Sequence, residues 1–293
     1  MRFFAPGLLL CAMLYPVWAH SQSTGASLPA RSADIALRFD VASVRPDDEA
    51  FKPPSFALSA DDSFRDPHGR FHADFALLTY IQFAYKLWLT DEEQKDILTH
   101  LPEWVRTQRF DIEATAPSDA TKEDYRVMMR TLLEERFSLK PHFENKDKPV
   151  LAMVLVKEGI PGPKLLPHAQ GPPCEDKPPL GTFDCYMFGV RTLANGMWLA
   201  GSRATTMDLI ANFVGSVAGN YGEISRRVVD QTGLKGLWDF TVITPSPTKS
   251  PDAPAPAFTA LEAIRDQLGI RLKSTHAIVS LPVIDHIQKP DEN

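Results

Sequence analysis

The stretch RVVDQTGLKGLWDFTVITPS, Arg227–Ser246, decides the fold because its second half has a weaker copy earlier in the chain. That copy is RFDIEATAPS, Arg109–Ser118, and the alignment places Asp239 on Asp111. Both segments alternate apolar and polar residues and end in Pro-Ser, which is the pattern of a strand that stops at a turn. We therefore expect the chain to contain two related units.

The residues around the two strands also correspond. A glycine, a short strand and apolar residues at helical spacing precede each one, as in GRFHADFALLTYIQFAY and GMWLAGSRATTMDLIANFVG. A helical pattern and a last apolar strand follow each one, ending in PVLAMVLVKEG and LPVIDHIQKP. We predict an α+β fold made of two diverged copies of a strand-helix-strand-helix-strand unit, with mixed or antiparallel sheets and helices on one face. The alternative is that two α+β units share this order by chance.

The predicted organisation has five parts, whose limits follow changes in composition. They are a signal peptide at 1–22, a flexible lead-in at 23–37, a first α+β unit at 38–160, a Pro-rich disulfide loop at 161–190 and a second α+β unit at 191–293. The Pro-rich segments contain too many prolines for a helix or a central strand, so we expect loops there.

The first residues have the layout of a secretory signal. Arg2 precedes an apolar run from Phe3 to Trp18, and small and polar residues follow it. Pro6 and Pro16 interrupt the run, which is shorter than the about 20 apolar residues that a membrane span needs. We expect a cleaved signal, no stable membrane span and an exported protein, periplasmic or extracellular. Retention of this segment as an anchor is the alternative.

The charge balance excludes one class of partner. The net charge is −6 at pH 7, and no basic block interrupts the acidic composition. A protein that binds nucleic acid or an anionic membrane surface usually carries a basic patch. We therefore expect no nucleic-acid partner and name an envelope protein or a glycan as the candidate partner.

Removal of the signal would also remove Cys11 and leave Cys174 and Cys185 as the only pair of cysteines. In an exported chain, two thiols that flank a short Pro-rich segment predict a local disulfide. The alternative is half of a metal site, but no second pair of cysteines or suitably spaced histidine accompanies them.

The sequence contains no complete catalytic, cofactor-binding or metal-binding motif. His68 and His72 could form one edge of a metal site, although we expect His68 in a turn and no further ligands follow. FVGSVAG around Ser216 lacks two glycines of the nucleophile elbow, so we expect Ser216 to serve packing or a helix end. Asp285 and His286 are neighbours on a strand and point to opposite faces. We predict no catalytic, cofactor or metal residues from these patterns.

Asp111 and Asp239 are the candidate site residues that the repeat offers. One carboxylate from each copy could supply the pair that general acid/base catalysis needs. The alternative is that each Asp accepts hydrogen bonds from backbone donors near the start of its strand and recurs because the unit recurs. The loop DQTGLKG before the second strand is expected to turn the chain, with Gly233 and Gly236 available for positive φ.

Several segments carry a resemblance to a known family, among them FDVASVRP, VVDQTGLKGLWDF and the closing PVIDHIQKPDEN. The chain resembles a soil-associated family of uncharacterised exported domains found in many copies in acidobacteria. The resemblance covers nearly all of the chain from about Phe39 onward. Some members of that family are fused to sensor metallopeptidases of the BlaR type, which implies sensing outside the cytoplasm. The resemblance implies no catalytic residues, and the His-Glu-x-x-His motif of such peptidases is absent here.

We therefore predict a non-catalytic binding or sensing module of the cell envelope. The first alternative is an envelope hydrolase that uses carboxylates from the two copies, which requires Asp111 and Asp239 to lie within about 10 Å of each other across a cleft. The second alternative is a structural surface protein, which would have no concave pocket.

Overall fold

The computed structural model of the protein describes residues 37–174, 181–246 and 257–290. The predicted signal peptide at 1–22 lies outside these residues, and so does the lead-in at 23–37 apart from Leu37. Within them the fold is α+β, as the sequence predicted, with helices packed on antiparallel and mixed sheets.

The first sheet has the order β1-β3-β2, with both pairs antiparallel. Its strands are β1 (Val41–Asp47), β3 (Arg109–Thr115) and β2 (Arg70–Ala76). β1 contains Pro46 and continues to Asp47, because β1 is an edge strand and tolerates a residue without an N–H. Phe110 and Ile112 point from β3 into the first hydrophobic cluster.

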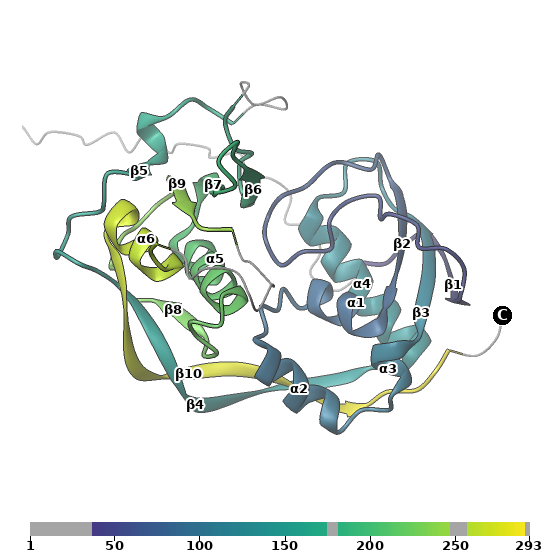
Figure 1. The fold of residues 1–293 in the computed structure, drawn as a ribbon. Coiled ribbons are helices and arrows are strands. Elements are labelled where there is room, and N and C mark those ends of the chain that lie inside the picture. The colour runs from purple at the N-terminus through teal and green to yellow at the C-terminus, as the bar shows by residue number, and fades with distance from the viewer. Residues whose placement is uncertain (1–36, 175–180, 247–256, 291–293) are drawn as a thin grey trace, which may run out of the picture. The chain divides into compact units, whose positions relative to one another are not determined.

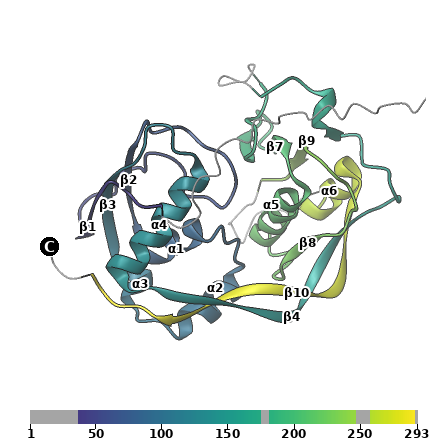
Figure 2. The same ribbon diagram turned by 180° about the vertical axis from the view of Figure 1, so that it is seen from behind.

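Two helices cover the apolar face of this sheet, α1 (Leu77–Ala84) and α4 (Lys122–Phe137), and they lie side by side in Figure 2. The N-cap of α4 is Thr121. Its hydroxyl accepts from the Asp124 N–H, while the Asp124 carboxylate accepts from the Thr121 N–H, which forms a capping box.

The second sheet repeats this arrangement with the order β5-β9-β7-β6. Its strands are β5 (Leu165–Pro167), β9 (Trp238–Thr244), β7 (Trp198–Thr205) and β6 (Gly189–Thr192). The second hydrophobic cluster consists of residues from these strands and from two helices, α5 (Met207–Asn220) and α6 (Ala260–Leu268).

The ends of α4 and α6 match as well. α6 begins with a capping box between Thr259 and Glu262, and both helices end on a left-handed residue, Ser138 after α4 and Gly269 after α6. The predicted order of strand, helix, strand, helix and strand is therefore present twice. The limits 38–160 and 191–293 for two units stay a prediction.

The last strand of each copy pairs with the last strand of the other. β4 (Lys140–Leu155) and β10 (Ile270–His286) form a long antiparallel ribbon, visible in Figure 1, and β8 (Val228–Asp230) adds to β4 in parallel. Both strands begin well before the apolar segments that predicted them. The added residues of β4 are largely exposed, so their sequence lacks the alternation that marks a half-buried strand, whereas β10 begins at the buried Ile270.

The ribbon joins the two hydrophobic clusters. Leu151, Met153 and Leu155 of β4 belong to the second cluster, although β4 follows the helix of the first copy. Ile284 of β10 packs against the first cluster, although β10 follows the helix of the second copy. β4 therefore packs in the second cluster, and β10 runs from the second cluster, where Ile270 is buried, to the first.

Two further helices, α2 (Asp91–Thr99) and α3 (Trp104–Thr107), interrupt the first copy between α1 and β3. α2 begins at Thr90 with a capping box to Glu93, a Thr-x-x-Glu signal that stands in the sequence. In the described part of the chain, no helix is both long and apolar enough to cross a bilayer.

Candidate functional site

Asp111 lies on the polar face of the first sheet and has two partners. Its Oδ2 atom is 3.1 Å from Lys52 Nζ, and its Oδ1 atom is 3.2 Å from His72 Nε2. Only 17% of the Asp111 side chain is exposed. Since both carboxylate oxygens face a cationic or titratable group, the observed role of Asp111 is to hold Lys52 and His72 on the sheet.

Two further carboxyl groups lie beside Asp111. Asp74 is directly opposite Asp111 on β2, and the side chains of Asp74 and Asp47 are both buried. Burial raises the pKa of Asp74 above its usual value, and the nearby charge of Asp47 adds to this. The pKa of Asp47 is lowered, chiefly by the N–H that Glu49 donates to it. Arg109 lies within 3.4 Å of Asp74 and 3.5 Å of Asp47 and offsets part of their charge.

Asp239 has a different environment in the second sheet. Its Oδ1 atom accepts a hydrogen bond from the backbone N–H of Ala204 at 2.8 Å and lies 2.7 Å from His168 Nδ1. His168 is the first residue of the 3₁₀-helix η1 (His168–Gln170), 71 residues before Asp239. The side chains of Asp239 and His168 are each 18% exposed.

The predicted disulfide between Cys174 and Cys185 is present, with 6.0 Å between the two Cα atoms. Cys174 Sγ lies 3.7 Å from His168 Nε2, so one imidazole ring contacts Asp239 on one side and the disulfide on the other. The sequence did not indicate this arrangement.

The structure does not bring Asp111 and Asp239 together. They lie in different sheets, and no residue of the described segments contacts both carboxylates. Each instead has its own histidine, His72 or His168. The two aspartates thus have matching positions in the repeat but different partners.

The other histidine and serine candidates lie apart from these aspartates. His68 is in a turn with φ 52° and contacts Asp66, as expected from the glycine that follows it. Ser216 is exposed within α5 rather than packed or at the helix end. Asp285 lies 2.8 Å from His142 across the ribbon. The described segments hold no group of three or more His, Cys, Asp or Glu side chains that could bind a metal ion.

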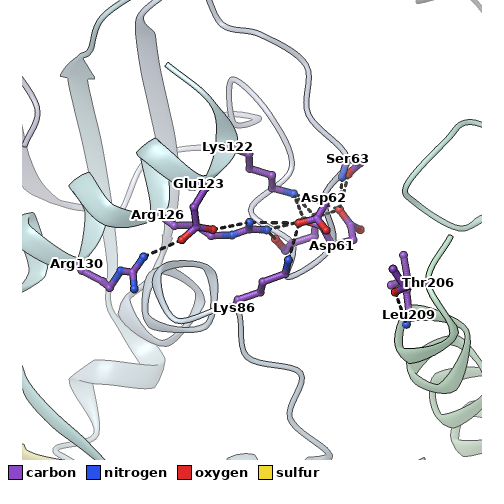
Figure 3. A network of polar contacts seen from close by, with 11 residues as sticks. Asp61, Asp62, Ser63, Lys86, Lys122, Glu123, Arg126, Arg130, Thr206 and Leu209 are labelled. Atoms are coloured by element: carbon purple, nitrogen blue, oxygen red, sulfur yellow. Dashed lines mark hydrogen bonds and ion pairs between the residues drawn. The ribbon is translucent and has the colours of Figure 1, made fainter. Parts of the chain in front are cut away.

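A buried ionic network holds the segment Ser59–Ser63 against α4 (Figure 3). Asp61 accepts from Lys122 at 3.2 Å, and Arg126 donates to the Asp61 carbonyl at 2.6 Å. Lys122 is 5% exposed, and burial lowers the pKa of its ammonium group, opposed by the attraction of Asp61. Every charged group here already has a partner, so the network accounts for the docking of this segment and leaves no open site.

A cleft of about 550 Å³ lies between the start of α2 and one face of α5. Residues Trp88–Glu92 form one wall, and Ile224–Val228 close the third side. The α5 wall consists of residues that recur every four positions and therefore share one helix face: Ala211, Asn212, Gly215, Ser216, Gly219 and Asn220. These residues are small or polar, which leaves room beside the helix.

An ion pair fixes the two sides of this cleft to each other. Arg227 Nε and Nη2 donate to the two carboxylate oxygens of Glu93 at 2.8 and 2.6 Å, and Nη2 also donates to the Trp88 carbonyl. Glu93 is buried, yet its pKa is lowered because the hydrogen bonds from Arg227 and Thr90 outweigh the effect of burial. The walls are thus preorganised by a bidentate contact.

Several polar side chains of the cleft are not used by the fold. The side chains of Asn212, Ser216, Asn220 and Ser225 make no hydrogen bond to any residue in the described part of the chain. Arg226 donates to Ser274 from the rim at 3.0 Å. Amide and hydroxyl groups that face a cleft without internal partners are available to a ligand.

The sequence did not point to Glu93, Arg227 or His168. For Glu93 the capping signal was present, and it identifies the helix but not the arginine that pairs with it. Arg227 and His168 are separated from their partners by 134 and 71 residues, so the chain topology alone brings these pairs together.

Comparison with protein families gives one match, to the family described as a protein of unknown function (DUF3738), over residues 78–287. The chain belongs to this family. The match begins within α1 and ends just after β10, so it includes the cleft, the Asp239 site and the ribbon, whereas Lys52 and His72 of the Asp111 site precede it. Neither the curated proteins nor the solved structures gave a match.

Proposed function

We propose that the protein is an exported, non-catalytic binding or sensing module of the cell envelope and that its ligand occupies the cleft between α2 and α5. The observation that carries this proposal is the set of amide and hydroxyl side chains, Asn212, Ser216, Asn220 and Ser225, that line the cleft without an internal partner. The disulfide between Cys174 and Cys185 and the resemblance to exported domains with sensor-fused relatives support the exported location.

The chemistry of the cleft suits a polar, largely uncharged ligand. Trp88 supplies an aromatic surface at one wall, and Asn212 and Asn220 supply two amides on the other. The charge of Arg227 is already neutralised by Glu93, so it gives little attraction to an anion. A glycan or a peptide segment meets these conditions, since each combines hydrogen-bonding groups with surfaces that stack on an aromatic ring.

The alternative of an envelope hydrolase receives no support from the positions of the two aspartates. Paired carboxylates must face one substrate, and Asp111 and Asp239 lie in separate sheets with separate partners. Neither residue lines the cleft.

The experiment is a pull-down of residues from about Gln22 onward, with the disulfide formed, against solubilised envelope and purified peptidoglycan. The test variant is Ser216→Trp, which places a large side chain in the cleft. The matched control is Glu134→Trp on α4, also exposed within a helix but away from the cleft. We expect the wild type and the control to retain the same component and Ser216→Trp to lose it. Equal retention by all three proteins would place the ligand elsewhere, and no retention by the wild type would refute a binding function for these ligands.

A further inference from the structure

The imidazole of His168 connects Asp239 to the disulfide in a defined order. A carboxylate only accepts hydrogen bonds, so the 2.7 Å contact between Asp239 Oδ1 and His168 Nδ1 places a proton on Nδ1. In the neutral ring Nε2 is then the unprotonated nitrogen, and this atom faces Cys174 Sγ at 3.7 Å. A base oriented by a carboxylate and directed at a sulfur is the arrangement that activates cysteine thiols.

The backbone holds both residues in place. His168 donates its N–H to the Leu237 carbonyl at 2.9 Å, one residue before β9 begins, and the Ala204 N–H fixes the Asp239 carboxylate from β7. Gly171 allows the close approach, because a Cβ atom at this position would lie 2.5 Å from Asp239 Oδ2. The His-Asp pair is therefore positioned by two strands and a turn before any change at the disulfide.

A buried cation, Arg203 of β7, contacts the segment that carries Cys174. Arg203 is 6% exposed and donates from Nη2 to the Pro173 carbonyl at 2.8 Å, next to Cys174. Its backbone bridges Cys185 on the other side of the disulfide. The Arg203 Nε atom has no hydrogen-bond acceptor among the described residues. Positive charge and a histidine beside a cysteine both stabilise its thiolate form.

We propose that Cys174–Cys185 is a redox-active disulfide that exchanges with a dithiol, and that His168, positioned by Asp239, stabilises Cys174 as the thiolate. An incoming thiolate of the dithiol attacks Cys185 Sγ. The Cys174–Cys185 bond breaks, its electron pair remains on Cys174 Sγ, and a mixed disulfide forms at Cys185. The second thiolate of the dithiol then attacks the dithiol sulfur of that mixed disulfide and releases Cys185.

The step is balanced in atoms and electrons. The dithiol is oxidised to its disulfide and loses two electrons and two protons, and the protein gains both. One proton resides on Cys185 and the other on His168 Nε2, which forms an imidazolium next to the Cys174 thiolate. The reaction takes place at the second sheet, outside the cleft, and it is independent of the ligand proposed for that cleft.

Alkylation of the reduced protein tests the proposal. The protein is reduced with dithiothreitol, and the rates at which iodoacetamide modifies Cys174 and Cys185 are measured by peptide mass spectrometry between pH 5 and pH 9. A tenfold rise in the thiolate fraction gives a net rise of about threefold in rate, since the nucleophilicity of a thiolate falls with its basicity. We expect Cys174 to react at least about threefold faster than Cys185 at pH 6. By pH 9 this advantage should be lost or reversed, because both thiols are then largely ionised and the less basic thiolate is the weaker nucleophile.

Three variants separate this role from a structural one. His168→Ala should abolish the advantage of Cys174 at pH 6, and Asp239→Asn should reduce it. His142→Ala removes a histidine of a similar Asp-His contact on the ribbon and should change nothing. The wild-type comparison of two cysteines in one molecule does not depend on the folding of any variant. Equal rates with the same pH profile for Cys174 and Cys185, whether the reduced protein stays folded or unfolds, would overturn the proposal.

Discussion

The ion pair between Glu93 and Arg227 is the contact whose removal has the most predictable effect. Glu93→Ala removes two charge-assisted hydrogen bonds and leaves the Arg227 guanidinium largely buried. Loss of one partner of a buried pair costs about 3–5 kcal/mol. Because Arg227 is 19% exposed and keeps the Trp88 carbonyl, we expect the lower end of this range, a loss of about 3 kcal/mol in the free energy of unfolding.

The assay is urea unfolding at pH 7. The shift of the urea midpoint is converted into a change in the free energy of unfolding with the m value, which should be the same for all variants. Glu93→Gln keeps one side-chain oxygen as the acceptor for the Thr90 N–H. It loses the charge and one of the two oxygens that accept from Arg227, and we expect a smaller loss of about 2 kcal/mol. The matched control is Glu92→Ala, in the same helical turn but exposed, with an expected change below about 0.5 kcal/mol. If Glu93→Ala were no more destabilising than this control, the reasoning that the pair holds α2 in place would be refuted.

Three further predictions concern charge and backbone conformation. Burial and the charge of Asp47 raise the pKa of Asp74, so the folded state binds this proton more tightly than the unfolded state does. The stability of the wild type should therefore fall as pH rises from 3.8 through the folded pKa. The melting temperature of Asp74→Asn should rise relative to that of the wild type over this pH range, and the difference should be absent below it. The hydrogen bond that His142 donates to Asp285, with a smaller effect of Glu144, raises the pKa of His142. Its NMR titration should therefore have a midpoint above 6.5, which Asp285→Asn lowers. The associated stabilisation is present below pH 6.5 and is lost as pH rises through the folded value. Gly269→Ala should destabilise the protein by about 1 kcal/mol more than Gly159→Ala in urea unfolding, because both residues have φ 68° but only at Gly269 would a Cβ atom meet backbone, at 2.5 Å. The first argument would be contradicted if the difference in melting temperature between Asp74→Asn and the wild type did not change with pH. The second would be contradicted by a His142 titration midpoint at 6.5, and the third by equal losses of stability in Gly269→Ala and Gly159→Ala.

The sequence predicted those elements whose local pattern and burial agree. β3, β9 and α4 have an apolar stripe on one face, and Thr121 supplies a cap, so period and capping point to the same structure. The first half of β4 has no such pattern, because residues 140–149 are exposed on both faces of the ribbon and depend on β10 for their conformation. Its charged residues and two prolines have the composition of a loop, so the local sequence alone predicts a loop there.

The candidate site was less accessible from the sequence than the fold. The repeat drew attention to Asp239, but the contact of Asp239 with His168 depends on the pairing of β5 with β9. The cleft likewise depends on the packing of α2 against residues that follow α5. The spacing of small residues along α5 is visible in the sequence, although it does not distinguish a ligand site from close helix packing.

The pairing of β4 with β10, the last strands of the two copies, has a consequence for biosynthesis. His286 pairs with Lys140, so β4 leaves the ribosome long before its partner exists and neither hydrophobic cluster can be completed until β10 follows. During that interval a long strand with free edges is exposed to association with other chains. Pro141, Pro149 and the lysines between them lie on this waiting strand, where they oppose such association. The prolines and lysines that make the first half of β4 hard to predict as a strand are thus suited to keep an incomplete chain from aggregating.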